Sequence, residues 1–228
     1  MKCRYRNGLF SVNGMSTAFY SYPCVKKVLA LTMIVKGMIP MTNAHFPLIT
    51  QNLSLDLVNT EIISYDKRHD LIQSEKDLMA WLELMGETAP FLSSFTLQQV
   101  QEPLQRIHQF RAELRKHFES IAEGSEPSQA FIAFLQDQIA AAPFSYQILD
   151  DKLARIPNGK LDDSILSLIA YDALWLIHTN DIQQLKRCAN EKCILLFLDK
   201  TGRRKWCSMK ICGNRQKVSR HQKKINNE

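Results

Sequence analysis

Apolar side chains recur at intervals of three and four residues along much of the chain, which is the spacing of one face of a helix. One such stretch follows Ser74–Asp77, a capping-box pattern, and stops at Gly86, so it predicts a helix between these points. A longer helix is predicted over about 96–122, with Pro103 kinking or trimming its first turns. A third is predicted over about 128–141. We therefore expect a mainly helical body.

A different pattern follows the third helix. Phe144–Leu149 and Leu153–Ile156 are short β-compatible runs, and Pro157–Gly159 has the composition of a loop, so a small β-hairpin is predicted. Asp163 is then expected to cap a helix that ends near Thr179. This segment is apolar nearly all round, the pattern of a central core helix. Together these elements predict the α+β fold class.

The first part of the chain follows neither pattern. Residues 1–43 show no sustained amphipathic period, so we expect a disordered leader or a start codon assigned too early. Residues 52–63 are rich in apolar positions, but their periodicity favours neither a helix nor a strand. We expect the chain to divide into the leader, a domain over 44–182 and a C-terminal module over 183–228.

Charge is distributed unevenly along the chain. Residues 186–228 hold 13 of the 29 Lys and Arg residues but 3 of the 23 Asp and Glu residues, a balance of +10. The preceding residues hold the remainder, with a balance of −4. A mildly acidic body therefore carries a basic tail, and this asymmetry favours a polyanionic partner for the tail.

Cysteine use and hydropathy indicate the compartment. Six cysteines in 228 residues are too few for a scaffold held together by disulfides. The one candidate for a secretion signal, residues 26–36, lies inside the chain and lacks a small-residue cleavage site. No apolar run reaches the roughly 20 residues needed to span a bilayer. We expect a cytoplasmic protein, not bound to a membrane, whose reduced thiols are available to a metal.

Four cysteines form two pairs near the C-terminus, Cys188-x4-Cys193 and Cys207-x4-Cys212, with 13 residues between the pairs. Two thiolate pairs at such a separation can close one tetrahedral zinc site. A redox dithiol prefers the Cys-x-x-Cys spacing, and catalytic zinc needs an open coordination position that four thiolates do not leave. The pattern predicts one structural Zn2+ bound by these four residues.

The residues around the pairs predict the local fold of the module. Ile194–Leu198 and Arg203–Trp206 are expected to pair as a hairpin, with Lys200–Gly202 at the turn. Ser208 is expected to cap a helix that holds Cys212 in its first turn. Two cysteines in a loop, a hairpin, and a helix with two cysteines make a treble-clef-like layout.

Basic residues lie between the cysteine pairs and continue beyond them. Lys217, Arg220, His221 and Lys224 recur at intervals of three and four residues, which places them on one face of the expected helix. A solvated face without a ligand would normally mix in acids, whereas unbroken cations neutralise phosphates and release counterions. The expected nucleic-acid contacts are Arg203, Arg204, Lys205, Lys210, Arg215, Lys217, Arg220, His221 and Lys224.

The body carries few residues that suggest catalysis. His108 and His117 point to different faces of one predicted helix, and His178 ends another, where the helix dipole favours an imidazole. Asp172 lies inside the apolar helix, and we expect all four residues to be structural. The sequence contains no glycine-rich phosphate loop and no nucleophile elbow. We expect no enzyme activity.

The residues Cys212-Gly213-Asn214-Arg215 resemble the signature of the CGNR zinc finger, and the resemblance extends through CANEKC, LFLD and WCSM. Leu55–Thr60, LDLVNT, is similar to a motif of the ABATE domain that usually precedes this finger. The resemblance covers about 45–224. It implies a bacterial, stress-linked transcription regulator with an α+β ABATE domain and a treble-clef finger that binds DNA. It also implies that the four cysteines bind zinc and that the finger's basic residues contact DNA.

Our main hypothesis is a zinc-dependent regulator whose finger docks on DNA through a basic C-terminal helix. Its ABATE domain would bind a small-molecule effector or mediate homodimerisation. One alternative is an RNA-binding protein. Another is an enzyme or small-molecule-binding protein with a ligand pocket at Asp56 and Asn59 and a purely structural finger. A third is a protein–protein adaptor, expected if the basic face is buried.

Overall fold

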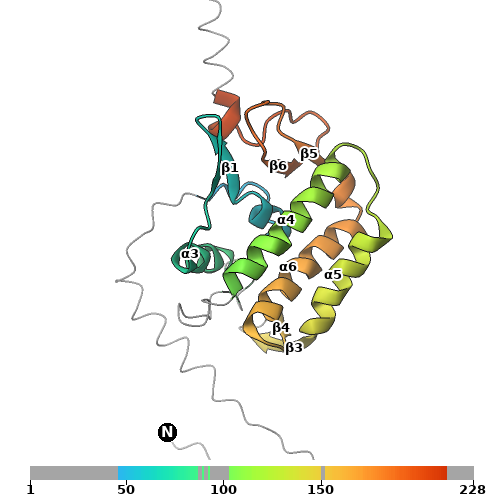
Figure 1. The fold of residues 1–228 in the computed structure, drawn as a ribbon. Coiled ribbons are helices and arrows are strands. Elements are labelled where there is room, and N and C mark those ends of the chain that lie inside the picture. Colours follow the sequence, from blue (N-terminus) through green and yellow to red (C-terminus); the bar gives the residue numbers. More distant parts are fainter. Residues whose placement is uncertain (1–45, 87–88, 90–91, 93–102, 150–151, 215–228) are drawn as a thin grey trace, which may run out of the picture. The chain divides into compact units, whose positions relative to one another are not determined.

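The computed structural model describes residues 46–86, 89, 92, 103–149 and 152–214, all within one compact unit, Met41–Glu228. The leader predicted over 1–43 lies outside the described residues. The described part combines helices with three two-stranded antiparallel sheets, in agreement with the α+β class (Figure 1).

Three long helices form the centre of the fold. They are α4 (Pro103–Ala122), α5 (Gln129–Ala141) and α6 (Leu161–His178), which lie side by side (Figure 1). α6 contacts α4, α5 and the short helix α2 (Leu53–Val58), whose residues are all buried. The prediction of a central core helix is therefore confirmed. The part of the second predicted helix before Pro103 lies outside the described residues.

Capping residues set the ends of two helices, and the first of these caps was predicted. Ser74 and Asp77 form both hydrogen bonds of the capping box that begins α3 (Glu75–Met85), and Gly86 ends this helix. The Ser128 side chain accepts a hydrogen bond from the backbone N–H of Phe131 and caps α5. Local sequence alone is enough for these ends because each cap binds N–H groups of its own helix.

α6 begins earlier than the sequence indicated. Its N-cap is Lys160 and not Asp163, so that prediction was wrong. Asp162 and Asp163 lie in the first turn, where the helix dipole favours carboxylates, and both accept hydrogen bonds from Arg106 of α4. The Asp163 carboxylate lies 2.9 Å from the Arg106 Nη1 atom, and thus binds a neighbouring helix.

Two hairpins belong to the body. β3 (Phe144–Leu149) and β4 (Lys152–Pro157) pair in the predicted positions. β1 (Glu61–Ser64) and β2 (Lys67–Asp70) form a second antiparallel pair, which comes from a stretch that periodicity left partly unassigned. Its turn is Tyr65–Asp66, and both residues have positive φ angles, 51° and 60°, which two-residue hairpin turns of this type require.

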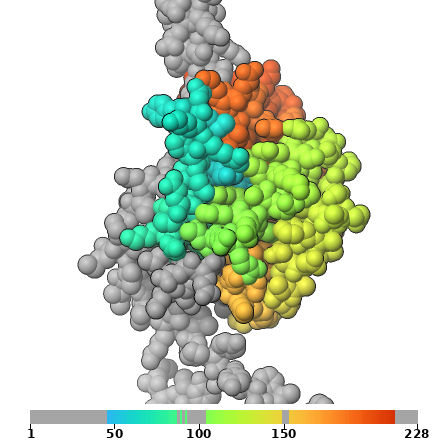
Figure 2. Space-filling model, in the orientation of Figure 1, coloured from blue at the N-terminus to red at the C-terminus, as the bar shows by residue number. Residues whose placement is uncertain are grey.

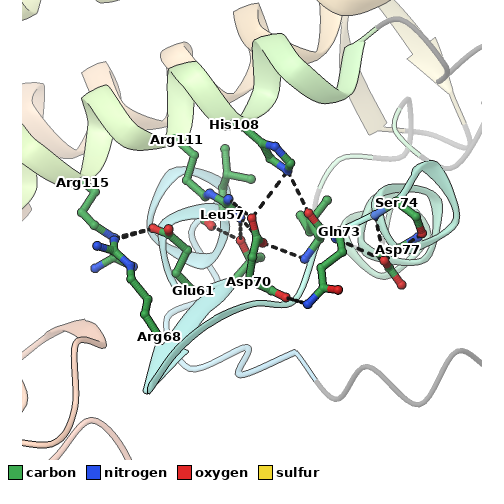
Figure 3. A network of polar contacts seen from close by, with 12 residues as sticks. Leu57, Glu61, Arg68, Asp70, Gln73, Ser74, Asp77, His108, Arg111 and Arg115 are labelled. Carbon is green, nitrogen blue, oxygen red and sulfur yellow. Dashed lines mark hydrogen bonds and ion pairs between the residues drawn. The ribbon is translucent and has the colours of Figure 1, made fainter. Parts of the chain in front are cut away.

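Two buried arginines of α4 bind the β1–β2 hairpin (Figure 3). Arg111 donates to Asp70 of β2 and, at 2.7 Å, to the Thr60 hydroxyl. Arg115 donates from Nε to Glu61 of β1 at 2.8 Å. Burial alone would raise the pKa of Asp70, but its hydrogen bonds, chiefly from Arg111, outweigh burial and lower it. The hairpin is therefore attached to the helices by charge as well as by packing.

One hydrophobic core joins the helices, and its largest fully buried side chains include Trp81, Phe118 and Phe131. Leu185 and Leu196, from the C-terminal module, belong to the same core. None of the described helices combines the length and the apolar character needed to cross a membrane.

Candidate metal centre

The four cysteine sulfur atoms converge. The Sγ atoms of Cys188, Cys193, Cys207 and Cys212 all lie within 4.8 Å of one another, and the Cys193 and Cys207 sulfurs are 3.8 Å apart. Zinc–sulfur bonds of about 2.3 Å in a tetrahedron place the sulfurs about 3.8 Å apart. Three of the four residues are deeply buried and none is in a disulfide. The donor set and its spacing fit one structural Zn2+, as predicted.

The first cysteine pair lies in the loop of a small hairpin. β5 (Leu185–Arg187) ends directly before Cys188, and β6 (Leu196–Leu198) begins shortly after Cys193. The two strands are antiparallel, with Arg187 opposite Leu196, and the Cys188 N–H donates to the Leu195 carbonyl at 3.1 Å. The hairpin thus holds both sulfurs of the pair on one loop.

This pairing corrects the expected hairpin. β6 pairs with the strand that precedes it, and the described residues Arg203–Trp206 form no strand. The reason lies in Asp199, whose buried carboxylate accepts hydrogen bonds from the N–H groups of Thr201 and Arg204. These bonds fold the chain back around one side chain. The Lys186 ammonium, 2.7 Å away, lowers the pKa of Asp199 and keeps it charged.

The second pair is held by a helical turn and by an arginine. Ser208 caps η4 (Met209–Gly213), a short π-helical turn, by accepting from the Ile211 N–H at 3.1 Å, which confirms the predicted cap and places Cys212 in that turn. Arg204 donates to the carbonyls of Trp206 and Cys207, and its guanidinium lies 4.4 Å from the centre of the Phe197 ring. Arg204 thus braces the segment that carries Cys207.

Hydrogen bonds to sulfur favour thiolates at the site. The Cys207 N–H donates to the Cys188 sulfur at 3.4 Å, and the Asn190 side-chain amide donates to the Cys212 sulfur at 3.5 Å. Contacts from Cys193 and Cys207 lower the pKa of the Cys188 thiol, and the contact with Cys188 raises the pKa of the Cys193 thiol. A divalent cation would let all four groups be thiolates. Asn190 was not singled out from the sequence. Its position between Cys188 and Cys193 is the feature that could have indicated a partner of the metal ligands.

The predicted nucleic-acid contacts fall into three groups. Arg203, Lys205 and Lys210 are exposed, and Arg203 and Lys205 line a groove together with Trp206 and Met209. Arg204 borders the same groove, but its guanidinium is occupied by the internal contacts described above. The remaining predicted contacts lie outside the described residues: Arg215, Lys217, Arg220, His221 and Lys224.

The two residues proposed for a ligand pocket are both buried in the body. Asp56 accepts hydrogen bonds from the Thr50 hydroxyl at 2.8 Å and from backbone N–H groups of Ile49, Thr50 and Gln51. Asn59 binds the Leu196 backbone through both atoms of its amide. Their polar atoms are therefore engaged within the chain, and a ligand pocket at this place stays a prediction.

The four residues interpreted as structural have structural partners. The His108 ring bonds to the Ile72 carbonyl at 2.8 Å, and the His117 ring stacks on Phe131. His178 lies in the last turn of α6. The carboxylate of Asp172 accepts from the Ser54 N–H at 2.9 Å and the Ser54 hydroxyl at 2.6 Å, and burial raises its pKa.

Four converging thiols next to a helical α+β body define a protein with a structural zinc finger. The family model described as "CGNR zinc finger" matches residues 184–224, and the ABATE model, described as "Putative stress-induced transcription regulator", matches residues 51–180. Because the second match covers more than half of the chain, the protein belongs to the ABATE family. A comparison with curated proteins finds no match.

Proposed function

We propose that the protein is a zinc-dependent, DNA-binding transcription regulator whose finger docks on DNA. The observation that supports this best is the presentation of Arg203, Lys205 and Lys210 beside the metal centre. All three are exposed, and within the described residues none of them takes part in an ion pair. Cations that no carboxylate neutralises are available to phosphates.

The proposed interface extends beyond the described residues. The basic residues of 215–224 would continue from η4 as the C-terminal helix of a treble-clef-like finger. Arg204 is assigned a structural role in place of a DNA contact, because its guanidinium is bound to the backbone around Cys207. Phosphate contacts position a protein on DNA but do not specify sequence, so the described cations support docking more than base reading. The ABATE domain would bind an effector or mediate homodimerisation.

Binding of a labelled duplex DNA by the zinc-loaded chain tests the proposal. Replacing Arg203, Lys205 and Lys210 together with Ala is expected to weaken binding, and the slope of log K against log salt is expected to fall by about 0.9 for each lost phosphate contact. Zinc content should not change. A charge-matched control replaces Lys76, Lys116 and Lys160, which are exposed on the body, and should bind as the unmodified chain does.

A second variant tests the segment after η4. Replacing Arg215, Lys217 and Arg220 together with Ala should also weaken binding at unchanged zinc content. Equal affinities of the finger and control variants would contradict the proposal. Competition with an RNA duplex and a single-stranded RNA separates the main hypothesis from the RNA-binding alternative, because the proposal requires duplex DNA to be the tighter ligand.

A further inference from the structure

The body and the finger exchange side chains across their boundary. Leu185 and Leu196 of the finger belong to the hydrophobic core of the body. Conversely, Ile49 and Ile62 of the body pack against the buried cluster that contains Cys188, Cys207 and Cys212. In Figure 2 the finger (orange) lies against the β1–β2 hairpin (teal) and against the helices of the body (green). The apolar surroundings of the metal centre therefore come from both segments.

Asn59 makes the most specific contact at this junction. Its side chain is 0% exposed, its Nδ2 donates to the Leu196 carbonyl, and its Oδ1 accepts from the Leu196 N–H, both at 2.9 Å. The amide thus pairs with β6 as a neighbouring strand would. β5 lies along the opposite edge of β6, with Arg187 across from Leu196. Asn59 therefore fixes β6 between a strand of the finger and a side chain of the body.

Arg115 makes a second contact, two residues closer along the chain to Cys193. Its buried guanidinium donates to the carbonyl of Ile194, the residue directly after Cys193, at 3.1 Å. The same guanidinium donates to the Val58 carbonyl and pairs with Glu61. The carbonyl of one finger residue is therefore joined to the end of α2 and to β1 through a single side chain.

These two contacts, which we call the anchors, are made by Asn59 and Arg115 and hold the loop that carries Cys188 and Cys193. The two held residues, Ile194 and Leu196, flank Leu195, whose carbonyl accepts from the Cys188 N–H. Contacts at these points restrict the positions at which the loop can place its two sulfurs. Partners that hydrogen-bond directly to metal ligands change metal affinity about 10–100-fold when removed. Asn59 and Arg115 bind the backbone next to the ligands, so we expect the lower end of this range.

We propose that Asn59 and Arg115 are positioning residues of the zinc site, and that the ABATE body and the finger form one zinc-linked folding unit. The body completes the metal site although it supplies no ligand. By linkage, bound zinc stabilises the body segment that contacts the finger. This inference concerns metal affinity and folding and does not depend on DNA binding.

Zinc competition against a coloured chelator, with the full chain, tests the proposal. Asn59→Ala is expected to weaken zinc binding about 10-fold and to speed zinc release. Asn158→Ala is the matched control, because its amide donates to the Pro143 carbonyl in the β3–β4 region, away from the metal. This control should keep the zinc affinity of the unmodified chain. Unchanged zinc affinity in a folded Asn59→Ala chain would overturn the proposal.

Hydrogen exchange of the unmodified chain covers the case in which Asn59→Ala fails to fold. Removing zinc with a chelator should speed exchange of the body amides next to the anchors, at the end of α2, in β1 and in α4 around Arg115. Amides of β3 and β4 serve as the internal reference and should exchange as before. Equal protection of α2, β1 and α4 with and without zinc would show two independent domains and would overturn the proposal.

Discussion

The ABATE body and the finger reach their folds by different physical means. In the body, large side chains such as Trp81, Phe118 and Phe131 are fully buried in one core. In the finger, the buried cluster consists of Leu195, Phe197 and three cysteines, with Cys193 packed against it. Burial of apolar area stabilises the body, whereas so small a cluster needs the binding energy of a metal. One chain can therefore join a core-stabilised part to a metal-stabilised part, provided that specific contacts hold the two together.

Loss of one zinc ligand is expected to have the largest effect. Cys207→Ser should lower the zinc content from one equivalent to almost none, because structural zinc contributes roughly 10–16 kcal/mol of binding free energy in small zinc modules. Metal analysis and near-ultraviolet circular dichroism measure this change. Cys24→Ser, which replaces a cysteine other than the four predicted ligands, should keep a full zinc equivalent. A full equivalent in Cys207→Ser would show that other donors close the site.

Truncation in the body core is expected to be the next largest effect. Trp81→Ala should lower the free energy of unfolding by about 3–5 kcal/mol, because it removes a fully buried indole. Trp81→Phe should be milder, since the indole N–H has no hydrogen-bond partner among the described residues. Chemical denaturation at saturating zinc gives both values. Equal losses of stability in the two variants would show that the volume occupied by the Trp81 side chain does not stabilise the core.

Two carboxylates of the body are expected to give pH dependences of opposite sign. Burial raises the pKa of Asp56 from 3.8 to about 6, although four hydrogen bonds work against burial. Its contribution to stability is therefore full below about pH 4 and is lost as the pH rises through 6. In Asp56→Asn this loss is absent. The free energy of unfolding of the unmodified chain minus that of the variant should fall by about 2 kcal/mol between pH 4 and 7.

Asp70→Asn supplies the contrasting case. Hydrogen bonds, chiefly from Arg111, overcome burial and lower the pKa of Asp70, so its contribution is present above pH 4 and is lost as the pH falls further. The same difference in unfolding free energy should therefore rise with pH. Loss of zinc at low pH cancels in both differences because all three chains share the same finger. Equal signs for the two variants would contradict these assignments.

The smallest expected effect separates two neighbouring arginines of the finger. Arg204→Ala should cost about 2 kcal/mol of finger stability, since hydrogen bonds from a charged donor contribute about 1.5–3 kcal/mol. Arg203→Ala removes an exposed side chain and should change stability by less than about 0.5 kcal/mol, while weakening DNA binding. Thermal unfolding with zinc present measures the first effect, and DNA titration the second. A larger loss of stability in Arg203→Ala than in Arg204→Ala would show that the internal contacts of the Arg204 guanidinium do not stabilise the finger.

Elements whose signals are local could be predicted from the sequence. The capping box at Ser74 and the cap at Ser128 involve atoms within one turn of each helix. The four zinc ligands were predicted because thiolate spacing is itself the requirement of the metal. The β1–β2 hairpin was missed, since its turn residues Tyr65 and Asp66 are not the Asn-Gly or Asp-Gly pairs that mark such turns.

Contacts between distant segments could not be read from residue types. Nothing in the sequence shows that β6 pairs with β5 instead of with Arg203–Trp206, because a three-residue strand carries almost no pattern of its own. The roles of Asn59 and Arg115 at the junction were not predicted, for a related reason. Both bind backbone carbonyls of the finger, and every residue offers a carbonyl, so the partner leaves no mark in the sequence.

Residue types and their spacing were enough to predict the capping box at Ser74, the metal ligands and the separation of a mildly acidic body from a basic tail. Two contacts are known only from the folded chain: the Arg204 guanidinium binds the backbone before Cys207, and Asn59 of the LDLVNT motif binds the finger. The cause is the distance along the chain over which each kind of interaction acts. Periodicity, caps and ligand spacing act within one element, whereas the Asn59–Leu196 pair joins residues 137 positions apart and exists only after both segments have folded.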